Sequence, residues 1–402
     1  MGLMNGVLLA RMLGPAEFGV YSIAVAAVTL FATLAALGLP SLVTREVAVH
    51  HAQEHGPLLK GLLATSQRWV LFASLFFVLV GGALVLLERV PPTLTMIGWV
   101  SVLVLIPLLA LNQLRAAILR GLHWVVTADV PDLLLRPLAM LIVLGGMYVF
   151  AIQMNADLAL LVQMGAVFLA LAFGHWLLAR RLPHFVRQAR AETTYPYWLR
   201  SSGVFLVITI VGLLEGQVPL YLLGHVAGPE QAGLYQATNQ IVGVVVMGLV
   251  AINMPLQPKL AAAWFRRDRR ESQKLVTEAT RLGTAVALAG ALVLVPFAEF
   301  ILRIYGSEYT GAANALRILV VGQFINAASG PCALVLAATG HQKYVVHGIG
   351  MGLVVSATVV LMLVPQYGAT GAALGVMIGL LVWNALLIYW SWRLVNIRTF
   401  IH

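Results

Sequence analysis

The chain alternates long apolar runs with short polar connections. A helix needs about 20 residues to cross ~30 Å of hydrocarbon. Eleven runs reach that length, near residues 19–39, 64–87, 94–114, 133–152, 157–178, 202–224, 232–253, 279–302, 313–338, 344–364 and 369–392. A further run, 1–13, is too short to span. Because backbone polar groups must pair internally in lipid, each run predicts a helix, and the pattern predicts an all-α integral membrane protein.

A turn motif occurs twice, half a chain apart. "GPAEFGVY" (14–21) and "GPEQAGLY" (228–235) share four of eight positions at an offset of 214 residues. Six predicted crossings separate the copies, so both have the same orientation across the membrane. Such parallel repeats occur in transporters whose halves move around a central site.

The repeat defines the expected organisation. We expect about twelve transmembrane helices in two pseudo-symmetric six-helix bundles, 1–179 and 201–402, joined by a cytoplasmic linker at 180–200. The offset places Met1 opposite Glu215, in the middle of a predicted helix. The first helix is therefore expected to be truncated.

Composition agrees with a membrane location. Apolar residues make up 60% of the 402 residues and charged residues 10%, whereas about a quarter of an ordinary soluble domain is charged. A single cysteine, Cys332, excludes an intrachain disulfide and a cysteine-rich zinc site.

The net charge of +10 mostly reports topology. Of the 25 Lys and Arg residues, 21 lie on alternate connections, the exceptions being Arg11, Arg89, Arg303 and Arg317. Positive charge marks the cytoplasmic side, so both termini are predicted to be cytoplasmic. The basic excess then gives no reason to expect a nucleic-acid partner.

Several motifs together carry a family resemblance. "LLARMLGPAEFGVYS", "ALGLPSLVTRE", "IYGSEYTGAANALRIL", "LVLAATGHQKY" and "YGATGAALG" resemble the polysaccharide-transporter branch of the MOP (multidrug/oligosaccharidyl-lipid/polysaccharide) superfamily. The resemblance implies the MOP fold and a Wzx-type flippase of the bacterial inner membrane, not an enzyme. Its substrate would be an undecaprenyl-diphosphate-linked oligosaccharide for O-antigen, capsule or exopolysaccharide, moved by alternating access. Membrane lipids and the polysaccharide polymerase machinery are the other expected partners.

Glu215 is the leading candidate for ion coupling. It lies in the middle of an apolar run, beside Gln217 and ahead of Pro219, where the helix is expected to bend. Ionisable groups at membrane depth usually face a cavity or a partner, so Glu215 is predicted to carry a proton or bind sodium; no other cofactor is expected. The alternative is a carboxylate hydrogen-bonded within the bundle.

Amide side chains form two groups at helical spacing. They are Gln236, Asn239 and Gln240 in one helix, and Gln323 and Asn326 in another. Residues three or four apart share a helix face, and amides both donate and accept, as sugar hydroxyls require. The alternative is hydrogen bonding between helices.

A lipid diphosphate also needs cations, for which arginine has a suitable forked geometry. Arg11, Arg136 and Arg317 are the substrate-binding candidates. Arg45 and Arg115 are instead expected to snorkel to the interface.

The remaining motifs favour structure. "HAQEH" (51–55) matches a zinc-protease pattern, but Gly56 and Pro57 would end any helix there, and no metal site is expected. Glycines at 371, 375 and 379 have the spacing that lets helices approach closely.

Three rival functions stay open at this stage. They are a flippase for peptidoglycan-precursor lipid, a MATE-like multidrug exporter, and a membrane-embedded glycosyltransferase or polymerase. The last would need a long extramembrane connection, and none is visible in the sequence.

Overall fold

The computed structural model describes residues 2–90, 93–192 and 195–400, and every regular element in these ranges is helical. The predicted all-α fold is thereby confirmed. The helices are α1 (Gly2–Ala35), α2 (Leu39–Ala52), α3 (Gly56–Leu86), α4 (Met96–Gly121), α5 (Val125–Val130), α6 (Arg136–Val149), α7 (Ala156–Arg181), α8 (His184–Gln188), α9 (Tyr195–Val226), α10 (Pro229–Phe265), α11 (Arg269–Leu294), α12 (Ala298–Arg303), α13 (Ala313–Ser329), α14 (Cys332–Ala338) and α15 (Gln342–Trp390). A π-helical turn, η1 (Pro131–Leu135), joins α5 to α6. A 3₁₀ turn, η2 (Ser307–Ala312), precedes α13, and a second π-helical turn, η3 (Ser391–Val395), follows α15.

Backbone contacts divide the chain into two compact units. The N-terminal unit contains Met1–Leu13 and Val20–Leu213, and the C-terminal unit contains Gly14–Gly19 and Leu214–His402. The short turn segment Gly14–Gly19 thus packs with the second unit although the chain on both sides of it belongs to the first.

Within the described residues, eight helices are long and apolar enough to cross a membrane, or nine if the bent pair of η2–α13 and α14 counts as one span. This number is below twelve partly because two long helices each join two apolar runs. α15 has 49 residues, about 74 Å of helix, and leaves helical geometry at Gly368; α1 does so at Gly14. The count of twelve stays a prediction.

Two details differ from the apolar pattern. The run 313–338 is broken between α13 and α14, where Gly330 has φ of 79° and Pro331 lacks the N–H that a continuous helix would use. The second is α9, which continues as one helix through Pro219; the bend expected there stays a prediction.

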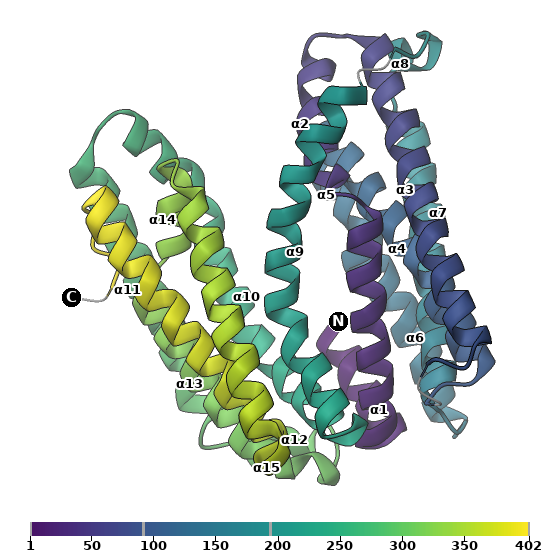
Figure 1. Cartoon of the computed structure of the whole chain (residues 1–402), viewed down its shortest axis with the longest axis vertical. Helices are drawn as coiled ribbons and strands as arrows, with labels where there is room; N and C mark the ends of the chain where they lie inside the picture. The colour runs from purple at the N-terminus through teal and green to yellow at the C-terminus, as the bar shows by residue number, and fades with distance from the viewer. Residues whose placement is uncertain (1, 91–92, 193–194, 401–402) are drawn as a thin grey trace. The chain divides into compact units, whose positions relative to one another are not determined.

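In the N-terminal unit, α4 is the central helix and packs against α2, α3 and α7. Figure 1 shows α4 lying beside α7. The Asp157 carboxylate at the start of α7 accepts a hydrogen bond of 3.1 Å from the Thr95 backbone N–H at the start of α4. This bond satisfies one of the unpaired donors at a helix N-terminus and ties the two helices together.

In the C-terminal unit, α13 packs against α10, α11 and α15, and Figure 1 shows α13 and α15 side by side. The two limbs of α15 also pack on each other. A Cβ at Gly379 would lie 2.7 Å from the carbonyl oxygen of Gly352, and one at Gly375 would lie 2.5 Å from the Val360 side chain. The glycine repeat therefore permits close helix packing, as its spacing predicts.

The repeated turns share one backbone conformation. Gly14 has φ 69° and ψ 172°, and Gly228 has φ 89° and ψ 170°. The two segments also contact each other reciprocally within the C-terminal unit. A Cβ at Gly19 would overlap the carbonyl oxygen of Pro229, and one at Gly233 would overlap that of Pro15.

A second pair of turns repeats as well. After α4, the Trp124 N–H donates to the Leu119 carbonyl at 2.9 Å, and after α14 the His341 N–H donates to the Leu336 carbonyl at 2.8 Å. The residue before each donor has a positive φ, 65° at His123 and 82° at Gly340. This is the same helix-ending motif at both sites, so the internal repeat is present in the backbone as well as in the sequence.

Candidate functional site

The N-terminal unit contains a polar cavity of about 550 Å³. Its walls come from α1, α2, α4 and the segment that runs from α5 through η1 into α6. The lining residues are Thr29, Pro40, Leu109, Asn112, Gln113, Ala116, Arg120, Asp129, Asp132, Leu133 and Arg136. Six of the eleven are charged or carry an amide on α4, which is unusual inside so apolar a chain.

A π-helical turn brings the carboxylates to this cavity. Pro131 cannot donate a backbone hydrogen bond and starts η1, which holds Asp132 in its first turn. π-turns inside helices are rare and often occur at functional sites. The turn is followed directly by Arg136 at the start of α6.

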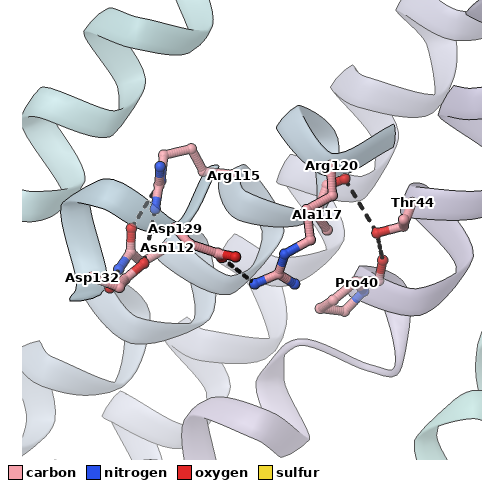
Figure 2. A network of polar contacts seen from close by, with 8 residues as sticks. All are labelled: Pro40, Thr44, Asn112, Arg115, Ala117, Arg120, Asp129 and Asp132. Carbon is pink, nitrogen blue, oxygen red and sulfur yellow. Dashed lines mark hydrogen bonds and ion pairs between the residues drawn. The ribbon is translucent and has the colours of Figure 1, made fainter. Parts of the chain in front are cut away.

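Arg115 is the buried centre of the network beside the cavity. Its Nη2 lies 2.9 Å from Asp132 Oδ2, and its Nε donates to Asn112 Oδ1 at 2.9 Å. The Asn112 amide also donates to Asp132, so the three side chains form a closed ring of contacts (Figure 2). The residue is 1% exposed, and a Cβ at Gly174 would lie 2.5 Å from its guanidinium.

The prediction that Arg115 snorkels to the interface is therefore wrong. Asp132 provides a partner inside the unit, and the absence of a side chain at Gly174 makes room for the guanidinium. The Arg45 side chain is 48% exposed and lies 2.8 Å from Glu46, so its expected place at the interface stays a prediction.

Arg120 and Asp129 form a second ion pair of 2.7 Å on the cavity wall, and both are partly exposed (Figure 2). Nearby, the Thr44 hydroxyl lies 2.9 Å from the Pro40 carbonyl and 3.2 Å from the Ala117 carbonyl, joining α2 to α4.

Arg136 also lines the cavity, and within the described residues it has no carboxylate partner. Because Asp132 and Asp129 neutralise Arg115 and Arg120, the positive charge of Arg136 remains to set the local potential. An anion in this cavity would meet a cation that no carboxylate in the described ranges already neutralises.

The other arginines named from sequence lie outside this cluster. Arg11 is an exposed residue of α1. Arg317, on α13, donates to Asn314 at 2.9 Å and pairs with Glu299 at 3.3 Å. Its charge is already balanced at a partly exposed position.

In the C-terminal unit, Glu215 lines a narrow recess against both limbs of α15, together with Gly352, Ser356, Gly379 and Trp383. The part of the chain that the structure describes gives its carboxylate no hydrogen bond or ion pair. The close approach of the two α15 limbs at Gly352 and Gly379 forms one wall of the recess.

The predicted amides are partly brought together. The Asn326 amide donates to Gln323 Oε1 at 3.2 Å, and Asn384 of α15 donates to Asn326 Oδ1 at 2.9 Å. On α10, Gln240 accepts a 3.4 Å hydrogen bond from Tyr305, while Gln236 is half-buried and Asn239 is exposed.

The sequence motif at 51–55 crosses a helix end, because α2 stops at Ala52. The His51 ring stacks on Phe185, with ring centroids 6.0 Å apart. In the described ranges, no group of three or more His, Cys, Asp or Glu side chains could hold a metal ion.

Comparison with known proteins gives consistent family matches. Residues 1–264, more than half of the chain, match the family described as "Polysaccharide biosynthesis protein", and residues 205–363 match the MatE family. The chain is 25% identical over 401 residues to a protein of Shigella flexneri named "Putative O-antigen transporter", covering 95% of this chain and 91% of the relative.

Solved structures share the fold at low identity. A multidrug resistance MATE family transporter of the MOP superfamily, in an inward-facing conformation, has a TM-score of 0.79 at 13% identity, over 98% of this chain and 94% of its own. The lipid II flippase MurJ, in an inward closed conformation, has a TM-score of 0.74 at 13% identity, over 96% and 84%. The chain belongs to the polysaccharide biosynthesis protein family and has the fold of the MOP-superfamily transporters.

Proposed function

We propose that the chain is a flippase that moves an undecaprenyl-diphosphate-linked oligosaccharide repeat unit across the bacterial inner membrane for surface polysaccharide synthesis. Both the family and the shared fold belong to transporters and not to enzymes. The observation that carries the proposal is the polar cavity of the N-terminal unit, in which Arg136 has no carboxylate partner among the described residues.

This cavity suits a diphosphate group. Arginine binds phosphate oxygens through two parallel N–H groups, and such charge-assisted hydrogen bonds are about twice as strong as neutral ones. Arg136 would make the first contact, and Arg120, on the same wall, would be released from Asp129 to make the second. Asp129 and Asp132 would compete with the diphosphate for the arginines. This competition would lower the affinity enough for the substrate to be released.

The translocation step is proposed to be alternating access between two six-helix bundles, 1–179 and 201–402, joined by the linker 180–200. The internal repeat of turns supports this arrangement. Both termini are proposed to be cytoplasmic. The polysaccharide polymerase machinery is the proposed partner on the periplasmic side of the membrane.

Coupling is proposed to occur at Glu215. A carboxylate with no hydrogen bond or ion pair among the described residues, in a largely apolar recess, is stabilised by a bound proton or sodium ion. Occupancy drives transport if the ion binds one conformation of the chain more tightly than the other.

Two rivals in the same superfamily fit the fold. A peptidoglycan-precursor flippase is supported by the similarity to MurJ, and a multidrug exporter by the MatE match and the MATE structures. A cationic drug would meet the unpaired charge of Arg136, whereas an anionic lipid head would be attracted to it. The cavity therefore favours an anionic substrate over a cationic drug.

Complementation of a bacterial strain that lacks its oligosaccharide flippase tests the proposal, with surface polysaccharide scored at matched protein levels. Wild-type protein should restore the polysaccharide, and Arg136→Gln and Glu215→Gln should each reduce it at least tenfold. Glu278→Gln, at an exposed position on α11, is the matched control and should behave as wild type. Full restoration by Glu215→Gln would place the coupling site elsewhere, and full restoration by Arg136→Gln would remove the argument for a diphosphate subsite.

A further inference from the structure

The C-terminal unit contains a second cavity, of about 240 Å³, between α10, α11, the α13–α14 break and α15. Its polar groups are Asn253, Thr280, Asn326, Trp383 and Asn384, and the rest of its lining is apolar or glycine. None of its described lining residues carries a charge. This distinguishes it from the cavity of the N-terminal unit and argues against an ionic occupant.

Two of the lining amides, Asn326 and Asn384, are held by hydrogen bonds within the protein. The Asn384 amide nitrogen donates to Asn326 Oδ1 and to the Leu380 carbonyl, both at 2.9 Å. Asn326 in turn donates to Gln323. With both nitrogen contacts used inside the protein, the Asn384 side-chain oxygen stays available as an acceptor.

Two further polar groups in the walls have no protein partner among the described residues. Trp383 Nε1 is buried and makes no hydrogen bond, and Asn253 makes none either. Asn253 is half-buried, whereas the indole N–H of Trp383 is a buried donor. A buried donor without a partner costs about 1–3 kcal/mol, so such a group usually marks a bound water or ligand.

Much of the remaining lining is apolar. Leu249, Leu387 and the indole ring of Trp383 contribute to it, next to a hydrophobic core cluster that contains Cys332 and Leu336. A ligand in this space would therefore meet hydrogen-bonding groups at some edges and an apolar or aromatic surface elsewhere.

We propose that this cavity is a binding subsite for one neutral sugar residue, with Asn384, Asn253 and Trp383 as the residues that select it. A pyranose ring has hydroxyl edges that need donors and acceptors and C–H faces that pack on apolar or aromatic surface. The inference rests on the proposed function, since it assigns the sugar portion of the substrate to the C-terminal unit. A neutral apolar compound is disfavoured because it would leave these amides and the indole N–H unpaired.

Saturation-transfer NMR on the purified full-length chain in detergent tests this. The probes are methyl glycosides of neutral hexoses and N-acetylhexosamines, with undecaprenyl phosphate and tetraphenylphosphonium as non-sugar probes. Wild-type protein should bind at least one glycoside. Asn253→Leu should weaken that binding about tenfold, the effect of losing a good hydrogen bond. The second variant, Asn384→Leu, should also weaken binding, but it removes the Asn384–Asn326 contact and could disturb the fold. Asn253→Leu leaves that contact intact, so it tests the subsite even if Asn384→Leu misfolds.

Thr358→Val, at an exposed site on the same helix as Asn384, is the matched control and should bind as wild type. No glycoside binding to wild type, or unchanged binding in both Asn253→Leu and Asn384→Leu, would overturn the inference. Displacement of a bound glycoside by tetraphenylphosphonium would also overturn it. Translocation measured on the same preparations separates the two proposals: transport without glycoside binding defeats the subsite alone, and binding without transport defeats the proposed function alone.

Discussion

Burial separates the two arginine–aspartate pairs of the N-terminal unit. The Arg115 side chain is fully buried and the Asp132 side chain is 29% exposed, while Arg120 and Asp129 are 44% and 31% exposed. Removing one partner of a buried pair leaves an uncompensated charge and costs about 3–5 kcal/mol. An exposed pair is worth about 0–1 kcal/mol, because water solvates the remaining charge.

Asp132→Asn should therefore destabilise the protein by about 3 kcal/mol, and Asp129→Asn by less than about 1 kcal/mol. Thermal unfolding of the two variants in the same detergent compares them directly. The two substitutions remove the same charge three residues apart, so each controls for the other. Equal melting temperatures would mean that Arg115 is not held by Asp132.

The sequence predicted some of these residue positions and not others. Arg136, a substrate-binding candidate from the sequence, lines a cavity in the structure, and its role in binding stays a prediction. Arg115 was assigned to the interface because the sequence alone does not show that Asp132, 17 positions later, folds back to contact it. The signal was present, since Asp129 and Asp132 are carboxylates in an otherwise apolar stretch. Asn384 and Trp383 were not identified from the sequence. A single polar side chain in an apolar run does not show which helix it will face.

At the scale of helices, the two repeated turns of the C-terminal unit contact each other very closely. Gly19 and Gly233 each face a proline carbonyl so closely that a methyl group would overlap it. The overlap is with backbone, which cannot rotate away as a flexible side chain could. Both turns have the same backbone shape because Gly14 and Gly228 adopt a positive φ.

Gly233→Ala should lower stability by about 2 kcal/mol or more, the range for overpacking, and reduce the melting temperature in detergent. Gly243→Ala is the control on the same helix, because its Cβ would have no neighbour within 4 Å. The control should be neutral or slightly stabilising, since alanine favours the helix. A drop of the same size in both variants would show that helix propensity, and not the contact between turns, is responsible.

The helices themselves were well predicted from hydropathy, because lipid leaves the backbone no other way to pair its polar groups. The boundaries were less accurate. α11 begins at Arg269, ten residues before the apolar run at 279, because Asp268 caps it by accepting from the Glu271 N–H at 2.9 Å. Helix α2 was not predicted separately, since Leu39–Ala52 mixes apolar and charged residues.

For the whole molecule, the distribution of Lys and Arg predicts that the α10–α11 connection is cytoplasmic and the α9–α10 turn periplasmic. Single cysteines at Arg270 and Glu230, both exposed, in a Cys332→Ser background report the two sides. A membrane-impermeant maleimide applied to intact spheroplasts should label Glu230→Cys and not Arg270→Cys. The reverse pattern would invert the topology.

The central claim is that the chain moves an anionic sugar lipid and not a cationic drug. The most direct measurement is translocation in liposomes that contain the purified protein and an undecaprenyl-diphosphate-linked oligosaccharide, followed by a lectin that binds sugars on the outer leaflet. With a proton or sodium gradient, wild-type protein should expose the sugar outside, and Arg136→Gln should reduce the rate about tenfold, as loss of a charge-assisted hydrogen bond predicts. Ethidium uptake by the same liposomes, with no movement of the sugar lipid, would contradict the account.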